Sequence, residues 1–342
     1  MKNLRKQVAS DPPSTERGRE PAPRWRAWSA QVTLVAAAAA LLYAALASWS
    51  DLGQVRDVLR TFSSAAAAEV GALVALGLVL RALRWHYYTR ALALGIPAAP
   101  SLLAFVAGFA FTATPGKAGE IVKSFLLKRR FGARVSQTAG TLVVERLTDL
   151  LAVLLLAVVG LERGVGPGWV LGASALVVGS ALGFLGSVRW QAAVVRLLER
   201  IPGAQRLERA LPELLGSSRS LLGPGRLAAG LALAVAAWSC EALALGVVLD
   251  ALGAEVPRSG AFFAFAAASL LGVLSMLPGG LGGFEASMIL ILGELGVGAS
   301  VAVAATLLFR LGTLWAVSFV GLAALGVWAA VYGRGAGPPE TR

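Results

Sequence analysis

Two arginine residues lie deep within apolar segments that are long enough to cross a lipid bilayer. Arg146 stands about 11 residues into segment 135–161 and Arg310 about nine residues into segment 301–331, which places each about 14–16 Å deep. Inserting a central arginine costs at least about 2.5–3.5 kcal/mol, so its side chain must face a partner or a water-filled cavity. We therefore expect both arginines to belong to buried charged sites.

The acidic residues near these arginines suggest different partners in the two cases. Asp149 follows Arg146 by three residues and Glu145 precedes Asp149 by four, so all three share one helix face. They form either a closed internal salt bridge or a functional site, and we favour the second because intramembrane ions are usually functional. Arg310 has no acidic neighbour at helical spacing, so its partner must be Glu241, Glu285 or an anionic ligand.

Two breaks rich in glycine and proline supply a second set of candidates. Pro115 and Pro278 interrupt apolar runs, and glycines follow each of them: Gly116, Gly119, Gly279, Gly280, Gly282 and Gly283. Half-helices that begin inside the bilayer would direct free N–H groups and positive dipole ends at the midplane, where a phosphate or carboxylate is the natural occupant. Lys117 and Lys123 could assist it. Glu120 and Glu285 are either caps of these half-helices or groups for gating or proton coupling.

The remaining polar candidates have more ordinary explanations. Arg81 and Arg84 precede Trp85 at a helix end, where they either snorkel to the surface or contact a lipid headgroup. The single histidine, His86, fits an interfacial aromatic belt. With one histidine and one cysteine, Cys240, we expect no metal site, and no cofactor is indicated. The glycine-rich segment 279–283 lacks the strand and the Lys-Ser/Thr of a nucleotide-binding loop.

The composition identifies the elements that must position these residues. The chain has 342 residues, of which 57% are hydrophobic and 15% charged, against roughly a quarter charged in soluble proteins. Segments 27–50, 164–188 and 311–333 are uncharged and long enough to span a bilayer. We expect one transmembrane domain over 27–333, an uncleaved first span, a disordered basic tail at 1–26 and a short tail at 334–342.

The positions of the basic residues predict a topology. The net charge is +12, but the lysines and arginines gather in alternate loops, as in the positive-inside pattern of a multi-pass protein. Nucleic acid is not needed to explain them. We expect the plasma (inner) membrane with both termini cytoplasmic, and an interfacial helix within the basic amphipathic segment 189–226.

One apolar segment is too short to cross the membrane. Segment 101–114 would cover about 21 Å of the roughly 30 Å hydrocarbon core, and both of its flanks are basic. A re-entrant hairpin that turns at Pro115 and returns through 118–127 satisfies both facts. Further spans are expected at 66–88, 135–161, 169–188 and 227–252, and 301–331 is either one tilted helix or a broken pair.

The same pattern recurs later in the chain. Residues 94–97 (LGIP), the break at Pro115 and Arg146 correspond to residues 252–257 (LGAEVP), the break at Pro278 and Arg310. The proline-to-arginine separations are 31 and 32 residues. Three spans lie between the two hairpins, so the second enters from the opposite side. The expected fold is therefore all-α, a polytopic transmembrane bundle of two inverted repeats, each with a re-entrant or broken helical hairpin.

Five motifs in this order resemble a known family. They are Arg81-x-x-Arg84-Trp85, Pro115-x-x-x-Gly119-Glu120, Glu145-Arg146-x-x-Asp149, residues 277–285 (LPGGLGGFE) and the late Arg310. The chain resembles the lysylphosphatidylglycerol synthase transmembrane region, also called flippase-like, over roughly residues 30–333. The resemblance implies that an anionic or amphiphilic lipid, such as a phospholipid, an aminoacyl-phospholipid or a polyprenyl-linked glycolipid, is moved or presented between leaflets.

Three functions follow as hypotheses. The leading one is a lipid flippase in which Arg146 and Arg310 compensate the charge of a lipid phosphate. The second is a non-transporting scaffold that docks a lipid-modifying or glycosyl-transferring enzyme. The third, an intramembrane enzyme, ranks last because no nucleophile or metal set accompanies the glutamates. Bifunctional relatives carry a soluble aminoacyl-transfer domain, for which nine residues after Gly333 leave no room, so we expect no lysyl transfer.

Overall fold

In a computed structural model, the protein is described for residues 52–112, 119–161, 205–275 and 277–333 and for isolated positions between 172 and 193. Within these residues every regular element is helical. The helices are α2 (Leu52–Thr61), α3 (Ser64–Ala91), α4 (Ala98–Gly108), α5 (Gly119–Phe131), α6 (Val135–Leu161), α9 (Gln205–Leu221), α10 (Pro224–Ala251), α11 (Arg258–Leu274), α12 (Gly283–Glu294), α13 (Ala299–Arg310) and α14 (Val317–Tyr332). The predicted first span, Pro115, Gly116, Lys117, most of the span 169–188 and both tails lie outside the described residues.

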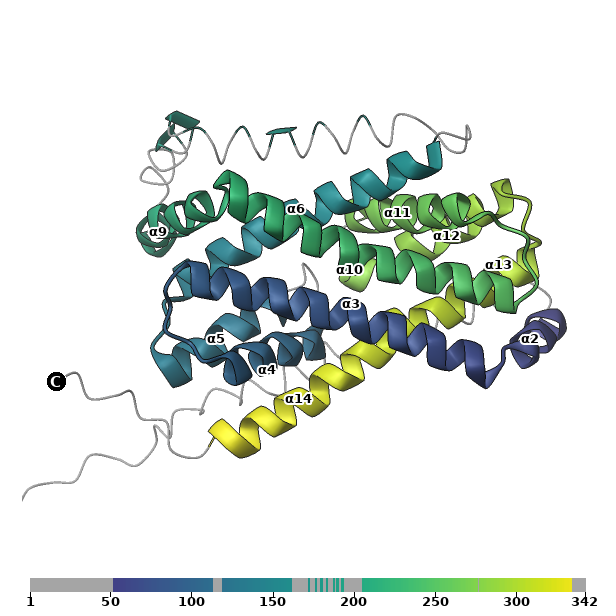
Figure 1. Cartoon of the computed structure of the whole chain (residues 1–342), viewed down its shortest axis with the longest axis horizontal. Helices are drawn as coiled ribbons and strands as arrows, with labels where there is room; N and C mark the ends of the chain where they lie inside the picture. Colours follow the sequence, from purple (N-terminus) through teal and green to yellow (C-terminus); the bar gives the residue numbers. More distant parts are fainter. Residues whose placement is uncertain are drawn as a thin grey trace, which may run out of the picture.

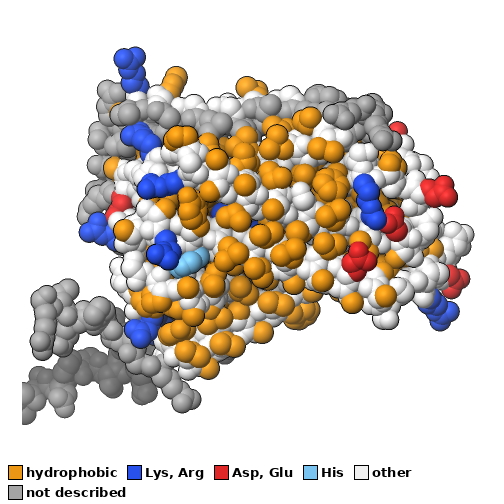
Figure 2. Space-filling view, in the orientation of Figure 1, with side chains coloured by type: hydrophobic (Ala, Val, Ile, Leu, Met, Phe, Trp, Pro, Cys, Tyr) orange, Lys and Arg blue, Asp and Glu red, His pale blue; other side chains and the backbone are white. Residues whose placement is uncertain are grey.

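Three of these helical segments are long and apolar enough to cross a membrane. They are α3, α10 and the run Ala299–Tyr332, while Ala98–Phe111 and α11 are apolar but shorter. Helix α6 has 27 residues and carries Glu145, Arg146 and Asp149 within its apolar sequence. In Figure 2 a broad hydrophobic band separates an end rich in Lys and Arg from an end where most of the visible Asp and Glu lie. The prediction of a membrane protein is confirmed.

Two turns of the chain are built alike, because glycine and proline occupy matching places. Helix α3 ends at Ala91 and is followed by Gly95 with φ 66°, and α10 ends at Ala251 and is followed by Gly253 with φ 72°. Pro97 and Pro257 then stand at the N-caps of α4 and α11 with extended backbones. Glycine permits the positive φ, and proline is well suited to the start of the next helix.

Helices α3 and α10 lie side by side and run in opposite directions (Figure 1). Small residues allow the close approach. A Cβ atom at Gly77 of α3 would lie 3.1 Å from the Ala237 carbonyl oxygen of α10. A Cβ atom at Gly230 of α10 would clash with the Tyr88 hydroxyl of α3. Close packing of this pair therefore depends on glycine at two positions.

Helices from the early part of the chain pack against helices from the late part. Helix α11 contacts α6, and α4 contacts α14. The crossing of α14 is tight, because a Cβ atom at Gly321 would meet the backbone of Phe109 and Ala110 in the 3₁₀ turn η1 (Phe109–Phe111). The largest core cluster joins residues of α10, α11, α12 and α13.

The late segment 301–331, for which two arrangements were open, is one continuous helical run. Helix α13 passes into α14 through η4 (Leu311–Ala316), a π-helical segment that begins directly after Arg310. Pi-helical turns hold one extra residue and often occur at functional sites.

Two polar helices lie at the ends of the bundle. Helix α2 was not predicted because it is short and polar, and it buries Val55 against the core cluster that includes α13. Helix α9 belongs to the predicted interfacial segment 189–226 and packs against α6. Ser218 of α9 donates to the Gly140 carbonyl oxygen of α6 at 3.2 Å. One face of α9 therefore binds the protein itself.

Candidate functional site

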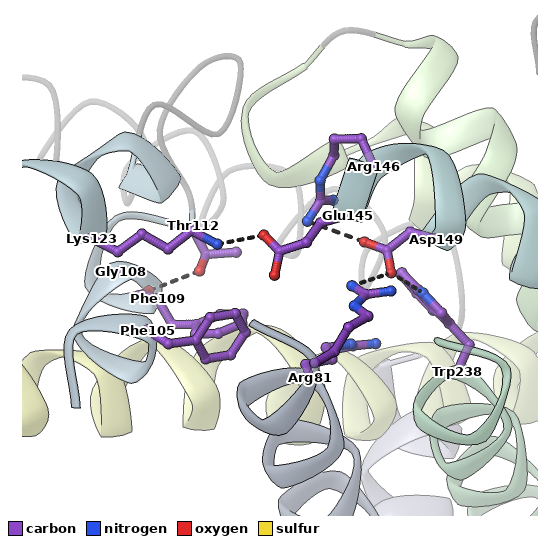
Figure 3. Close-up of a pocket in the computed structure, with 11 residues that line it drawn as sticks. Arg81, Phe105, Gly108, Phe109, Thr112, Lys123, Glu145, Arg146, Asp149 and Trp238 are labelled. Atoms are coloured by element: carbon purple, nitrogen blue, oxygen red, sulfur yellow. Dashed lines mark hydrogen bonds and ion pairs between the residues drawn. The ribbon is translucent and has the colours of Figure 1, made fainter. Parts of the chain in front are cut away.

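A cavity of about 70 Å³ lies where α3, α4, α5, α6 and α10 meet. Its lining combines cationic, acidic and aromatic side chains (Figure 3). The residues are Arg81, Arg84, Phe105, Gly108, Phe109, Thr112, Lys123, Glu145, Arg146, Asp149 and Trp238. Four cations and two carboxylates thus surround a space large enough for a few water molecules inside an apolar bundle.

Asp149 is the centre of the first group of contacts. Its carboxylate lies 2.7 Å from Arg84 and 3.2 Å from Arg146, and it accepts a hydrogen bond of 2.9 Å from the Trp238 indole. Arg84 also donates to the Thr148 hydroxyl at 3.1 Å. Both oxygens of Asp149 are therefore satisfied by charged or polar donors, as a buried carboxylate requires.

Lys123 and Glu145 form a second, separate pair in the cavity. The Lys123 Nζ atom lies 2.6 Å from Glu145 Oε2, and the two side chains are 3% and 1% exposed. The ammonium also lies 4.0 Å from the Trp85 ring centre and 4.8 Å from that of Phe105, within range of cation–π attraction. Glu145 Oε1 has no hydrogen-bond partner among the described residues.

Arg81 completes the cluster from the next turn of α3. It pairs with Glu241 of α10 at 2.6 Å and lies over the Trp238 ring at 4.4 Å. Its Nε and Nη2 atoms, and the Nε atom of Arg84, are buried without a hydrogen-bond partner in the described part of the chain. A buried N–H donor without an acceptor costs free energy, so this cluster is suited to bind an additional group that accepts hydrogen bonds.

A second charged group lies at the other break in the chain. Arg310 donates to Glu285 at 2.6 Å and to the Gly279 carbonyl oxygen at 2.8 Å. Glu285 is fully buried and also accepts from the Gly282 backbone N–H at 2.7 Å, which caps the start of α12. Gly279, Gly280 and Gly282 all have positive φ, which explains why glycines are needed here.

Aromatic rings connect the two charged groups. Trp238, which binds Asp149, contacts Phe265 at a centroid distance of 5.7 Å, and Phe265 contacts Phe309 at 5.7 Å. Phe309 stacks on Phe284 at 6.0 Å, and Arg310 lies over Phe284 at 4.7 Å. The rings come from α10, α11, α12 and α13, so the buried charges share one continuous core.

The structure brings most of the predicted site residues into these two groups. Arg81, Arg84, Lys123, Glu145, Arg146 and Asp149 line the cavity, while Gly279, Gly280, Gly282, Glu285 and Arg310 form the second group. Gly283 begins α12, and a Cβ atom there would clash with Ser275. Gly119 and Glu120 begin α5, and Pro278 begins the 3₁₀ turn η3 (Pro278–Gly280).

Several interpretations of single residues need correction. Arg84 is only 2% exposed and paired with Asp149, so the snorkelling interpretation is wrong for it. Trp85 and Tyr88 are fully buried, so they form no lipid-facing belt around His86. For Arg310, one of the predicted alternatives is confirmed: its partner is Glu285, whereas the other candidate, Glu241, pairs with Arg81. The Arg146–Asp149 pair exists, but Arg84 is the closer partner of Asp149.

Trp238, Phe105 and Thr148 were not predicted from the sequence as site residues. Trp238 could have been found, because it lies three residues before Glu241 in an otherwise apolar span, and an intramembrane carboxylate indicates a nearby partner. Phe105 and Thr148 give no such signal, since apolar and hydroxyl residues are ordinary in membrane helices.

Apolar helices long enough to cross a bilayer, enclosing paired charges, define an integral membrane protein. The chain belongs to the lysylphosphatidylglycerol synthase TM region family, whose sequence model matches residues 32–321. It is similar to a UPF0104 membrane protein of Methanothermobacter thermautotrophicus, with 27% identity over 299 residues that cover 80% of this chain and 88% of that protein. A second UPF0104 membrane protein of the same organism is 27% identical over 233 residues, covering 60% of this chain and 66% of that protein. The resemblance seen in the sequence is confirmed.

Proposed function

We propose that the protein binds the phosphate of an anionic membrane lipid in the cavity between α3, α5 and α6 and moves the lipid between leaflets. The observation that carries the proposal is the excess of buried cations there. Four cationic side chains and two carboxylates line the cavity, and Glu241 behind Arg81 supplies a third carboxylate. Among the residues whose side chains the structure describes, the cations of this cluster thus outnumber the carboxylates by one, and this excess favours a bound anion.

The donors fit a phosphate in particular. Guanidinium groups bind phosphate oxygens with paired N–H donors, and Arg81 and Arg84 have buried N–H groups without a partner among the described residues. Arg146 is the most accessible of the basic residues here, with 41% of its side chain exposed. In this proposal Arg146 meets the headgroup first, and Arg84 and Lys123 hold it within the cavity.

Alternating access in this proposal relies on two inverted repeats, formed by α3–α6 and α10–α14. Three observations support them: the opposite directions of α3 and α10, the matching turns at Gly95 and Gly253, and the reciprocal packing of α11 on α6 and of α4 on α14. The pairs α4–α5 and α11–α12 would be the hairpins that enter from opposite sides. Rocking of one repeat against the other would expose the cavity to each leaflet in turn.

The test is translocation of fluorescent phosphatidylglycerol in proteoliposomes. Arg146→Gln removes the accessible cation, and loss of one charged hydrogen bond worth about 1.5–3 kcal/mol should slow translocation roughly 10-fold to 100-fold. Arg134→Gln is the matched control, because Arg134 precedes the same helix, is 73% exposed and pairs with Glu213 away from the cavity. Equal rates for wild type and Arg146→Gln would contradict the proposed mechanism.

A scaffold for a lipid-modifying or glycosyl-transferring enzyme is the second candidate. The observation that favours it is helix α9, which packs on α6 through Leu211, Leu214 and Leu215 and leaves Pro212 and Arg219 exposed on another face. Co-purification of a partner enzyme that is lost in an Arg219→Gln, Arg226→Gln variant, in the absence of any lipid translocation, would favour this role.

A further inference from the structure

The two carboxylates that line the cavity differ in how many partners hold them. Asp149 is held by Arg84, Arg146 and Trp238, so it keeps its charge when any one of them moves. Glu145 has Lys123 as its one ion-pair partner among the described residues, and its Oε1 atom has no hydrogen bond there. Glu145 is also the more deeply buried of the two, at 1% exposure.

The other charged groups around Glu145 are already engaged elsewhere. From α3, Arg81 pairs with Glu241 of α10, Arg84 pairs with Asp149, and Tyr88 is neutral. From α6 itself, Arg146 pairs with Asp149. Helix α4 contributes aromatic rings and a backbone position to the cavity rather than charge. Among the described residues, every other cation near Glu145 is therefore engaged with another carboxylate when Lys123 is displaced.

A phosphate in the cavity would compete for Lys123. The ammonium has three N–H donors, and a phosphate oxygen is as strong an acceptor as a carboxylate. When Lys123 turns to the phosphate, Glu145 becomes a buried carboxylate without a counter-ion, and such a group binds a proton rather than remain charged. We propose that binding of each lipid phosphate is coupled to uptake of one proton at Glu145. This inference rests on the proposed function and adds the ion that accompanies the lipid.

The charges balance in this step. The phosphodiester brings one negative charge, and the proton that comes from water and bonds to the unpartnered oxygen of Glu145 brings one positive charge. Lys123 keeps its own proton and exchanges a carboxylate oxygen for a phosphate oxygen. The net charge of the cavity is therefore the same before and after binding, and the proton neutralises the carboxylate that Lys123 has left. A proton gradient across the membrane could then drive movement of the lipid.

The experiment measures proton uptake by the purified full-length protein in unbuffered detergent solution near neutral pH. A pH-indicator dye follows the addition of short-chain phosphatidylglycerol, whose phosphodiester does not itself titrate in this range. Glycerophosphoglycerol, the same headgroup without acyl chains, distinguishes a free phosphodiester from a lipid as the ligand. Calorimetry on the same samples gives the dissociation constant at several pH values.

Wild type should take up one proton for each lipid bound. Because protons favour binding, the dissociation constant for the lipid should rise up to tenfold for each unit by which the pH is raised. Glu145→Gln should bind the lipid with no proton uptake and no such pH dependence. Glu213→Gln is the matched control and should keep the uptake of one proton. Glu213 should take up no proton near neutral pH, because the hydrogen bond from Ser136 and the Arg134 guanidinium hold the pKa of its carboxyl below its usual value.

The outcomes separate this inference from the proposed function. Lipid binding without proton uptake in wild type would overturn the inference and leave lipid binding standing. Undiminished uptake in Glu145→Gln would overturn the assignment to Glu145. Absence of lipid binding in wild type would overturn the proposed function itself. If Glu145→Gln does not fold, the proton stoichiometry and the pH dependence of wild type still decide whether binding is coupled to a proton.

Discussion

Arg310 and Glu285 form an ion pair whose members depend on each other. The pair is almost fully buried, and Glu285 also caps α12 through the Gly282 N–H. Glu285 is the one ion-pair partner of Arg310 among the described residues, so Glu285→Ala should lower the free energy of unfolding by about 3–5 kcal/mol. The measurement is unfolding in detergent, followed by helical circular dichroism.

The control for this prediction removes both charges. A Glu285→Met, Arg310→Met double variant keeps similar volume without an unpaired ion, so it should be more stable than the single variant Glu285→Ala. A double variant that is less stable than Glu285→Ala would mean that the pair stabilises the protein well beyond the cost of its burial.

At the scale of single residues, the sequence indicated which charges needed partners but identified only some of those partners. Depth in the membrane singled out Arg310 correctly as a member of a buried ion pair, and helical spacing identified Asp149 as a partner of Arg146, whose own side chain is 41% exposed. Arg84 was assigned to a helix end, because its position in α3 does not reveal that Asp149, more than 60 residues later, lies beside it. Partners on separate helices depend on packing, which local spacing cannot predict.

At the scale of helices, the crossing of α14 over η1 depends on one glycine. A Cβ atom at Gly321 would come 2.3 Å from the Ala110 backbone nitrogen, so Gly321→Ala should destabilise the protein by about 1–3 kcal/mol. Gly326 is the matched control, because it lies in the same helix with open space around its Cβ position. Gly326→Ala should be neutral or stabilise the protein by up to about 1 kcal/mol. Thermal aggregation in detergent compares the two, and equal effects would contradict the tight crossing.

The contact of α3 with α10 can be tested with a disulfide. A Cβ atom at Gly77 would lie 3.6 Å from the Cβ atom of Cys240, within the range of about 3.5–4.5 Å found in disulfides. Oxidised Gly77→Cys should therefore show no free thiol to a maleimide reagent, and reduction should restore two. Gly77→Ser controls for the added side chain. Two reactive thiols after oxidation would show that the helices do not meet at this point.

The same variant bears on the proposed rocking motion. If the repeats move against each other at the α3–α10 contact, oxidation should stop lipid translocation in proteoliposomes, and a reducing agent should restore it. Equal translocation before and after reduction would mean that this contact stays fixed and that any movement occurs elsewhere.

The helices themselves were predicted more completely than the charged site. Apolar length gave α3, α6 and α10 to within a few residues, because membrane spans are set by hydrophobic length. Helix α2 was missed because it is polar and short. The π-helical segment Leu311–Ala316 was missed because its amino-acid composition does not distinguish it from an α-helical turn. Proline and glycine did predict the break at Pro278, where η3 interrupts the chain.

At the scale of the whole molecule, the distribution of charge predicts a definite topology. The last turn of α5 carries Lys128, Arg129 and Arg130, whereas the loop after α12 follows Glu294. In a Cys240→Ser background, we expect Lys128→Cys to react with an impermeant maleimide from the cytoplasmic side and Glu294→Cys from the opposite side. Intact cells and inverted vesicles provide the two sides. Labelling of both positions from one side would contradict the inverted arrangement of the two hairpins.

The reciprocal packing of α11 on α6 and of α4 on α14 has a consequence for how the chain could be divided. A cut between Leu222 and Pro224 would yield two fragments, and each would present to lipid the surface that its missing counterpart normally covers. Neither fragment should fold stably alone, whereas the two fragments produced in the same cell should associate and form the intact fold. The chain would then consist of two halves that each need the other to fold and that are joined by a short connecting segment.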